Sequence, residues 1–155
     1  MIEATVVSRR NSHNSDAWLE NDEIIITNAD HETNRGAWLR LADRLKLTIK
    51  VWQVTKLRNE NGQESSASSN VGLDCQDLFS LVTERTRIVA FTGSSNVLGS
   101  HWSDKKLREI TQEIRKRSQG NAFVAVDAVA FAPHMRLRPE EWGVDFVLWS
   151  WYKVC

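Results

Sequence analysis

The chain has 155 residues, of which 41% are hydrophobic, and its 20 Lys and Arg side chains balance 20 Asp and Glu. This length suits one domain with a sizeable core, and the apolar share is typical of a globular rather than a disordered chain. The net charge of zero argues against nucleic acid or an anionic membrane as an obligatory partner, and no apolar run approaches the ~20 residues of a membrane span.

The N-terminal end and the cysteines bear on the compartment. The first residues lack the apolar centre of a secretory signal, and Cys75 and Cys155 form neither a disulfide framework nor a metal-binding pattern. We therefore expect a reducing, cytoplasmic compartment. Residues 1–21 are polar and weakly patterned, which predicts a poorly ordered lead-in.

In the first half of the chain, short apolar runs flank a helical pattern. Residues 23–27 predict a buried strand, and Asn34 is a plausible N-cap for a helix with apolar residues at spacings near three and four. Residues 48–54 alternate and are β-rich, which predicts a second strand. Residues 57–72 are polar and rich in Ser and Asn, so we expect a long, exposed and mobile connection.

The second half continues the alternation of strands and helices. Its predicted elements are a helix over 74–82, a strand over 87–92, a helix capped by Ser103, a strand over 122–127, a helical turn over 139–142 and a strand over 145–149. This order predicts an α/β fold, a three-layer α/β/α sandwich with a mostly parallel sheet that includes the strands 23–27, 87–92 and 122–127.

Polar side chains follow the predicted strands. The first strand is followed by His31, the third by Ser94, Ser95 and Asn96, the fourth by Asp127, and the last by Ser150, Tyr152 and Lys153. Because the carboxyl ends of parallel strands meet at one edge, these side chains can converge. A lysine amine and a carboxylate are what pyridoxal phosphate needs, for its Schiff base and for its pyridine nitrogen.

Several segments, taken together and in order, resemble one family. They are Asp30-His31-Glu32-Thr33-Asn34 with Trp38, Ser95-Asn96-Val97-Leu98-Gly99, Val126-Asp127-Ala128-Val129 with Ala132-Pro133-His134, and Asp145-Phe146 followed by Ser150 and Tyr152-Lys153. They are similar to the class V aminotransferases, fold type I pyridoxal-phosphate enzymes that include the cysteine desulfurases, and most of all to the cysteine-desulfurase-like branch. The likeness runs from about Asp22 to Lys153.

The resemblance implies roles for three charged or ring-bearing residues. Lys153 would hold pyridoxal 5'-phosphate as a Schiff base, Asp127 would pair with the pyridinium nitrogen, and His31 would stack on the ring face. Without the resemblance, His31 is an ordinary turn histidine, Asp127 caps a turn and Lys153 is a solvated lysine.

The resemblance also implies roles for three uncharged polar residues. Asn96 would lie near the phenolic oxygen of the cofactor or the substrate carboxylate, and Ser150 and Tyr152 would bind its phosphate. The residues alone equally allow Asn96 to hold a turn, Ser150 to cap a strand end and Tyr152 to belong to the core.

The chain also departs from the family pattern. Ala130 stands where desulfurases of this class usually have a glutamine, and residues 1–20 hold no convincing phosphate-binding turn. The family continues past its lysine into a smaller domain, so the resemblance implies that residues 22–155 are a truncated, partial large domain. It implies an amino-acid substrate and a homodimer at full length, and it excludes Cys155 as the family's catalytic cysteine.

Other functions remain open on the residues alone. The chain could be a non-catalytic α/β binding or interaction module descended from such an enzyme. Residues 93–99 could form a phosphate loop of a nucleotide binder, although no GxGxxG or GxxxxGK[ST] pattern occurs. A scaffold could use exposed tryptophans, and we expect apolar surface around Trp149 and Trp151.

Overall fold

The computed structural model describes residues 18–58, 61, 63 and 70–153. A central sheet of five parallel strands has the order β2-β1-β5-β6-β7. Its strands are β1 (Glu23–Thr27), β2 (Thr48–Trp52), β5 (Thr86–Thr92), β6 (Phe123–Asp127) and β7 (Phe146–Leu148). The prediction that the three apolar runs share one parallel sheet is confirmed. The predicted lead-in falls largely outside the described residues and stays a prediction.

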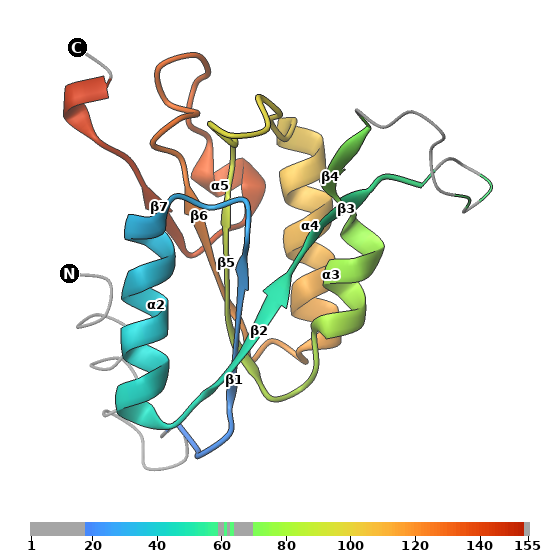
Figure 1. Ribbon diagram of the computed structural model, residues 1–155, viewed down its shortest axis with the longest axis vertical. Helices are drawn as coiled ribbons and strands as arrows, with labels where there is room; N and C mark the ends of the chain where they lie inside the picture. The colour runs from blue at the N-terminus through green and yellow to red at the C-terminus, as the bar shows by residue number, and fades with distance from the viewer. Residues whose placement is uncertain (1–17, 59–60, 62, 64–69, 154–155) are drawn as a thin grey trace.

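Helices cover both faces of this sheet, as Figure 1 shows, with α2 on one side and α3 and α4 on the other. The helices are α2 (Glu32–Leu45), α3 (Cys75–Leu81), α4 (Asp104–Arg117) and α5 (Pro139–Trp142), followed by the 3-10 turn η1 (Trp151–Lys153). This arrangement confirms the three-layer α/β/α prediction. No helix in the described part of the chain is long and apolar enough to cross a membrane.

The strand β1 shows how the apolar runs produce two cores. Its residues alternate between faces, so Ile25 packs in the cluster on the α3 and α4 side, whereas Ile24 and Ile26 pack with Trp38 and Leu41 of α2. All three isoleucines are almost completely buried, and each contributes roughly 1.5–3 kcal/mol by leaving water. Burial on both faces is the reason that the run is continuously apolar.

The helix α2 begins three residues earlier than predicted. Its N-cap is His31, whose Nδ1 accepts a hydrogen bond from the Thr33 amide at 3.2 Å, and not Asn34. An imidazole nitrogen can accept the bond that a capping Asn or Asp usually accepts. Asn34 instead lies in the first turn, where its Oδ1 accepts from the Trp38 indole at 3.1 Å. The site histidine is therefore held by the start of a helix.

An antiparallel hairpin lies where the sequence indicated an exposed connection over 57–72. Val54–Lys56 forms β3 and Val71–Leu73 forms β4, and the two pair with each other. Residues 71 and 72 belong to a strand and not to a connection, and Gly72 is buried, which contradicts the prediction, whereas Val71 is exposed as predicted. The predicted strand 48–54 was too long, because β2 ends at Trp52. Most of residues 59–69 lie outside the described residues.

The strand order places a crevice at the carboxyl edge of the sheet. The chain moves from β1 outward to β2 and then returns to β5 on the other side of β1. The loops that follow β1 and β5 therefore lead to helices on opposite faces of the sheet. Such a switch point opens a crevice beyond the strand ends, which is where α/β sheets bind ligands.

Candidate active site at the carboxyl edge of the sheet

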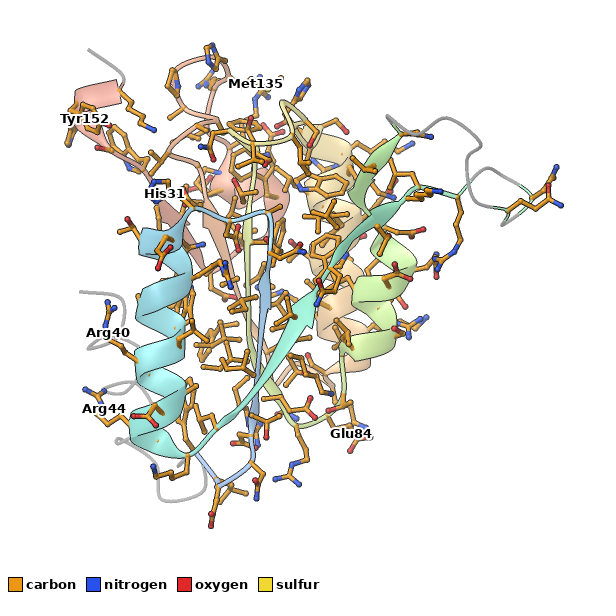
Figure 2. All side chains as sticks on the ribbon, in the orientation of Figure 1. His31, Arg40, Arg44, Glu84, Met135 and Tyr152 are labelled. Atoms are coloured by element: carbon orange, nitrogen blue, oxygen red, sulfur yellow. The ribbon has the colours of Figure 1, made fainter. Side chains whose placement is uncertain are left out.

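A cleft of about 460 Å³ lies at this edge. The structure brings all six predicted site residues to its wall, namely His31, Asn96, Asp127, Ser150, Tyr152 and Lys153. They come from the loops after β1 and β5, the end of β6 and the segment after β7. Figure 2 shows His31 and Tyr152 at the same end of the molecule, although they lie at opposite ends of the described chain. The convergence expected from parallel strand ends is thus observed.

Asp127 provides a buried carboxyl group in the cleft. It is the last residue of β6 and is 8% exposed, and its Oδ1 accepts a hydrogen bond from the Val129 amide at 2.9 Å. Burial raises the pKa of Asp127, and the Val129 amide, His31 and Lys153 only partly oppose this effect. The carboxylate of Asp127 therefore has a higher proton affinity than that of a solvated aspartate.

His31 and Lys153 approach the same carboxyl group from different elements. The capping bond fixes the imidazole of His31 with Nδ1 as the acceptor, which leaves the proton of the neutral ring on Nε2. Lys153 is exposed on η1, and its Nζ lies 6.0 Å from the centre of the Tyr152 ring. Both groups act on Asp127 and favour its ionised form. An acid, an imidazole and an amine thus share one cleft.

The loop after β5 is held by Ser95, which is 4% exposed. The Ser95 hydroxyl donates to the Ala29 carbonyl at 3.3 Å and accepts from the amides of Val97 and Leu98. The Gly99 amide donates to the Ser95 carbonyl at 2.9 Å. These amides are used within the loop, which argues against a phosphate loop over 93–99. Asn96 is the exposed member that lines the cleft.

Gly93 allows this loop to leave β5 beside β6. A Cβ atom at this position would lie 3.1 Å from Cγ1 of Val126 and 3.4 Å from Phe131. The Gly93 amide donates to the Asp127 carbonyl at 2.8 Å, which keeps the two strand ends together. The glycine thereby sets the position of Asp127 relative to the loop that carries Asn96.

The cleft also contains residues that sequence reasoning did not assign to it. Asn34 is 8% exposed, and its Nδ2 is buried without a hydrogen-bond partner among the described residues. Trp38 and Leu41 form an apolar wall one and two turns further along α2. Their positions on the helix face that begins beside His31 could have indicated them. Ala130 lines the cleft and has no side-chain hydrogen-bond donor.

The groups in the cleft fit pyridoxal 5'-phosphate. The apolar wall and the imidazole of His31 suit a flat ring, the buried carboxyl group of Asp127 suits a ring nitrogen that carries a proton, and Lys153 supplies an amine. Hydroxyl groups of Thr33, Ser94, Ser150 and Tyr152 line the same cleft and can donate to phosphate oxygens.

The family model for class-V aminotransferases matches residues 5–155. The chain belongs to the class-V aminotransferase family. The resemblance found in the sequence is therefore confirmed.

Individual relatives agree with this assignment. Aminotransferase-like protein FGM3 of Gibberella zeae is 41% identical over 133 residues, which are 86% of this chain and 29% of that protein. The cysteine desulfurase CsdA of Escherichia coli has the same fold, with a TM-score of 0.69, 22% identity, and coverage of 98% of this chain and 33% of that one. A PLP-bound C-S lyase of Staphylococcus hominis shares it at a TM-score of 0.53 and 15% identity, with coverage of 81% and 28%.

Proposed function

We propose that this chain is the cofactor-binding part of a pyridoxal-phosphate-dependent enzyme of the class V aminotransferase or cysteine-desulfurase type, with Lys153 as the residue that carries the cofactor. The observation that supports this most is the meeting of the Asp127 carboxyl group, the His31 imidazole and the Lys153 amine in one cleft. The three come from different elements, so no local pattern accounts for their meeting.

In this proposal the charged residues divide the work of binding and proton handling. Pyridoxal 5'-phosphate, when bound, supplies an electron sink for bonds broken next to an amino group. Lys153 contributes the amine that attaches the cofactor. Asp127 holds the proton at the ring nitrogen, and its burial makes that hold stronger. His31, fixed as the N-cap of α2, covers one face of the ring.

The uncharged polar residues orient the bound group. Ser150 and Tyr152 supply hydroxyl groups for the phosphate, and Asn96 supplies an amide for the phenolic oxygen or the substrate carboxylate. Ala130 cannot donate a hydrogen bond, so the phenolic oxygen relies on Asn96 alone or on a donor from elsewhere. This difference would leave the cofactor's electron distribution less constrained than in relatives with an amide at this position.

The proposal also covers the longer protein and its surroundings. Because the chain spans 29% of the FGM3 protein and 33% of CsdA, residues 22–155 would form part of a larger cofactor-binding domain. The whole protein would act on an amino acid and work as a homodimer. The thiol of Cys75 is free, as in the reducing cytoplasm that we propose as its location.

A second candidate function is an interaction module that descends from such an enzyme and has lost catalysis. Exposed aromatic side chains next to the cleft favour it, because Trp149, Trp151 and Tyr152 are 41%, 70% and 78% exposed. The rings of Trp149 and Trp151 contact each other with centres 4.3 Å apart. Exposed aromatic groups of this kind occur at surfaces that bind other proteins.

Reductive trapping separates the two candidates. The chain is mixed with pyridoxal 5'-phosphate, reduced with borohydride and mapped by mass spectrometry, for the wild type, Lys153→Ala and the control Lys116→Ala, whose lysine is 79% exposed on α4. We expect the label mainly on Lys153, with Asp127→Ala weakening cofactor retention roughly 10–100-fold, because it removes a hydrogen bond between charged groups.

The control variant Lys116→Ala should leave the label on Lys153 unchanged. A label spread evenly over the seven lysines at 46, 50, 56, 105, 106, 116 and 153 would refute the enzymatic proposal and favour the interaction module.

A further inference from the structure

Asp30 is a second buried acid next to the cleft, and it lacks a cation. It lies three residues beyond β1 and is 7% exposed, and its Oδ2 accepts a hydrogen bond from the Thr27 amide at 3.2 Å. Its Oδ1 is buried without a hydrogen-bond partner among the described residues. No Lys or Arg of the described chain forms an ion pair with it. Buried carboxyl groups normally have such partners, so Asp30 requires an explanation.

Asp30 lies within electrostatic reach of Asp127. The strand β5 separates their strands, and its last residue Thr92 is paired in register with Asp127. The Thr92 amide acts on the carboxyl group of Asp30, and so does the negative charge of Asp127. The two acids therefore lie on either side of the end of β5, and their negative charges repel each other.

The neighbours of the two acids differ in charge. His31 and Lys153 both act on Asp127 and favour its ionised form. At Asp30, only the uncharged hydrogen-bond donors of Thr27 and Thr92 lower the pKa. The negative charge of Asp127 raises it, as burial does. Burial first, and then this like charge, raise the pKa of Asp30 to about 7. The start of α2, next to His31, favours the ionised form and limits the rise.

We infer that Asp30 is a positioning residue that carries a proton near neutral pH and so leaves Asp127 as the one negative charge beneath the cleft. This inference rests on the proposed function, in which Asp127 faces the ring nitrogen of the cofactor. When Asp30 loses its proton, a second negative charge acts on that nitrogen, which then holds its proton more tightly. Asp30 thereby makes the proton affinity of the ring nitrogen depend on pH.

The first test measures the coupling without any cofactor. Side-chain carboxyl carbons of ¹³C-aspartate-labelled chain are titrated by NMR, and Asp30→Asn assigns the Asp30 signal. We expect a midpoint near pH 7 for Asp30 in the wild type, which falls by about one unit in Asp127→Asn because the like charge is gone. The control Asp43→Asn makes the same charge change at an exposed position of α2 and should leave the midpoint unchanged.

Two results of this titration overturn the inference. One is a midpoint of Asp30 near that of a solvated aspartate. The other is a midpoint that does not respond to Asp127→Asn, because Asp30 would then act independently of the site. Asp30→Glu serves as a second variant, since it keeps the acid and should keep an elevated midpoint if burial and Asp127 set it.

The second test adds pyridoxal 5'-phosphate and follows its absorption from pH 5.5 to 8.5. We expect the wild type to show a transition near neutral pH that is missing in Asp30→Asn and retained in Asp43→Asn. Identical profiles for the wild type and Asp30→Asn overturn the inference. If no variant retains the cofactor, the proposed function fails, and the NMR titration still decides whether Asp30 and Asp127 are coupled.

Discussion

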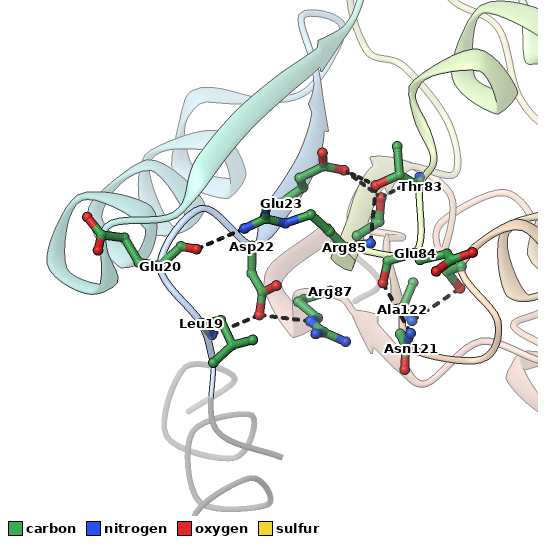
Figure 3. A network of polar contacts seen from close by, with 12 residues as sticks. Leu19, Glu20, Asp22, Glu23, Thr83, Glu84, Arg85, Arg87, Asn121 and Ala122 are labelled. Carbon is green, nitrogen blue, oxygen red and sulfur yellow. Dashed lines mark hydrogen bonds and ion pairs between the residues drawn. The ribbon is translucent and has the colours of Figure 1, made fainter. Parts of the chain in front are cut away.

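The two ends of the parallel sheet treat buried acids in opposite ways. At the amino end, Asp22 and Glu23 form the polar network shown in Figure 3, in which Asp22 Oδ2 lies 2.8 Å from Arg87 Nε. At the carboxyl end, Asp30 and Asp127 are similarly buried, yet neither forms an ion pair within the described chain. The difference indicates that the amino end is built for stability, whereas the carboxyl end keeps groups whose charge can change.

The pKa values follow the neighbours and not the burial alone. Burial by itself would raise the pKa of Glu23, but hydrogen bonds from Lys50, Thr83 and Thr86 outweigh it, and the pKa is lowered. Burial also acts on Asp30, where no cation opposes it, and there the pKa is raised to about 7. Burial acts in the same direction on both acids, and the neighbouring groups reverse its effect only at Glu23.

The largest effect is expected from breaking the ion pair at the amino end. Arg87→Met should lower the free energy of unfolding by roughly 3–5 kcal/mol, because the Asp22 side chain is 1% exposed and would lose its cation, keeping only the hydrogen bond from the Leu19 amide. Urea denaturation measures the loss. The control Arg85→Met removes an exposed arginine that donates to the Glu20 carbonyl, and it should cost less than about 1 kcal/mol. Equal losses would mean that the pair contributes nothing specific.

A somewhat smaller effect on stability is expected at the carboxyl end of the sheet, from the ionisation of Asp30 as the pH rises. The raised pKa of Asp30 means that its contribution to stability is complete below its unfolded value of 3.8 and is lost as the pH rises through about 7. Between pH 4 and pH 7 this group alone should lower the free energy of unfolding by roughly 3 kcal/mol.

The contribution of Asp30 is measured as a difference between two proteins, because other groups titrate in the same range. Urea denaturation at several pH values is compared for the wild type and Asp30→Asn. The two curves should converge toward acid and separate toward neutral pH, where the variant is the more stable. Parallel curves would show that Asp30 has an ordinary pKa.

The smallest effect is expected from Lys50, which lies 2.8 Å from Glu23 Oε1. Lys50→Met should cost roughly 1–2 kcal/mol at pH 7, since Glu23 keeps the hydroxyl groups of Thr83 and Thr86. The lowered pKa of Glu23 contributes stability above its unfolded value of 4.5, and this contribution is lost as the pH falls through the folded value. The variant should therefore lose less stability in acid than the wild type does.

The matched control for Lys50 is Lys46→Met, at the C-cap of α2. Lys46 is 72% exposed and lies 4.0 Å from Asp43, so its removal should change stability by less than about 0.5 kcal/mol. If Lys50→Met behaved like this control, the lowered pKa of Glu23 would have to come from the two threonines.

The sequence by itself determined the layers of the fold and the set of candidate site residues. Continuous apolar runs such as 23–27 and 122–127 are imposed by burial on both faces of a parallel sheet, so they can be read locally. Because parallel strands present their carboxyl ends at one edge, the residues that follow them, His31 and Asp127 among them, could be expected to converge. The family motifs identified the same positions.

Only the tertiary structure decided how each side chain is used. His31 became a cap because the backbone before α2 was extended, and the amides of the loop over 93–99 turned inward onto Ser95. The pairing of β4 with β3 depends on contacts across a connection that carries no strand pattern of its own.

Asp30 shows this division most clearly. Asp30 and Asp22 are the same residue type, and they lie on either side of the first strand. Asp22 forms an ion pair with Arg87, whereas Asp30 is enclosed with Thr92 and Asp127 and forms no ion pair within the described chain. A pKa depends on burial and on charges a few ångströms away, and these are supplied by segments distant in sequence that only folding brings together.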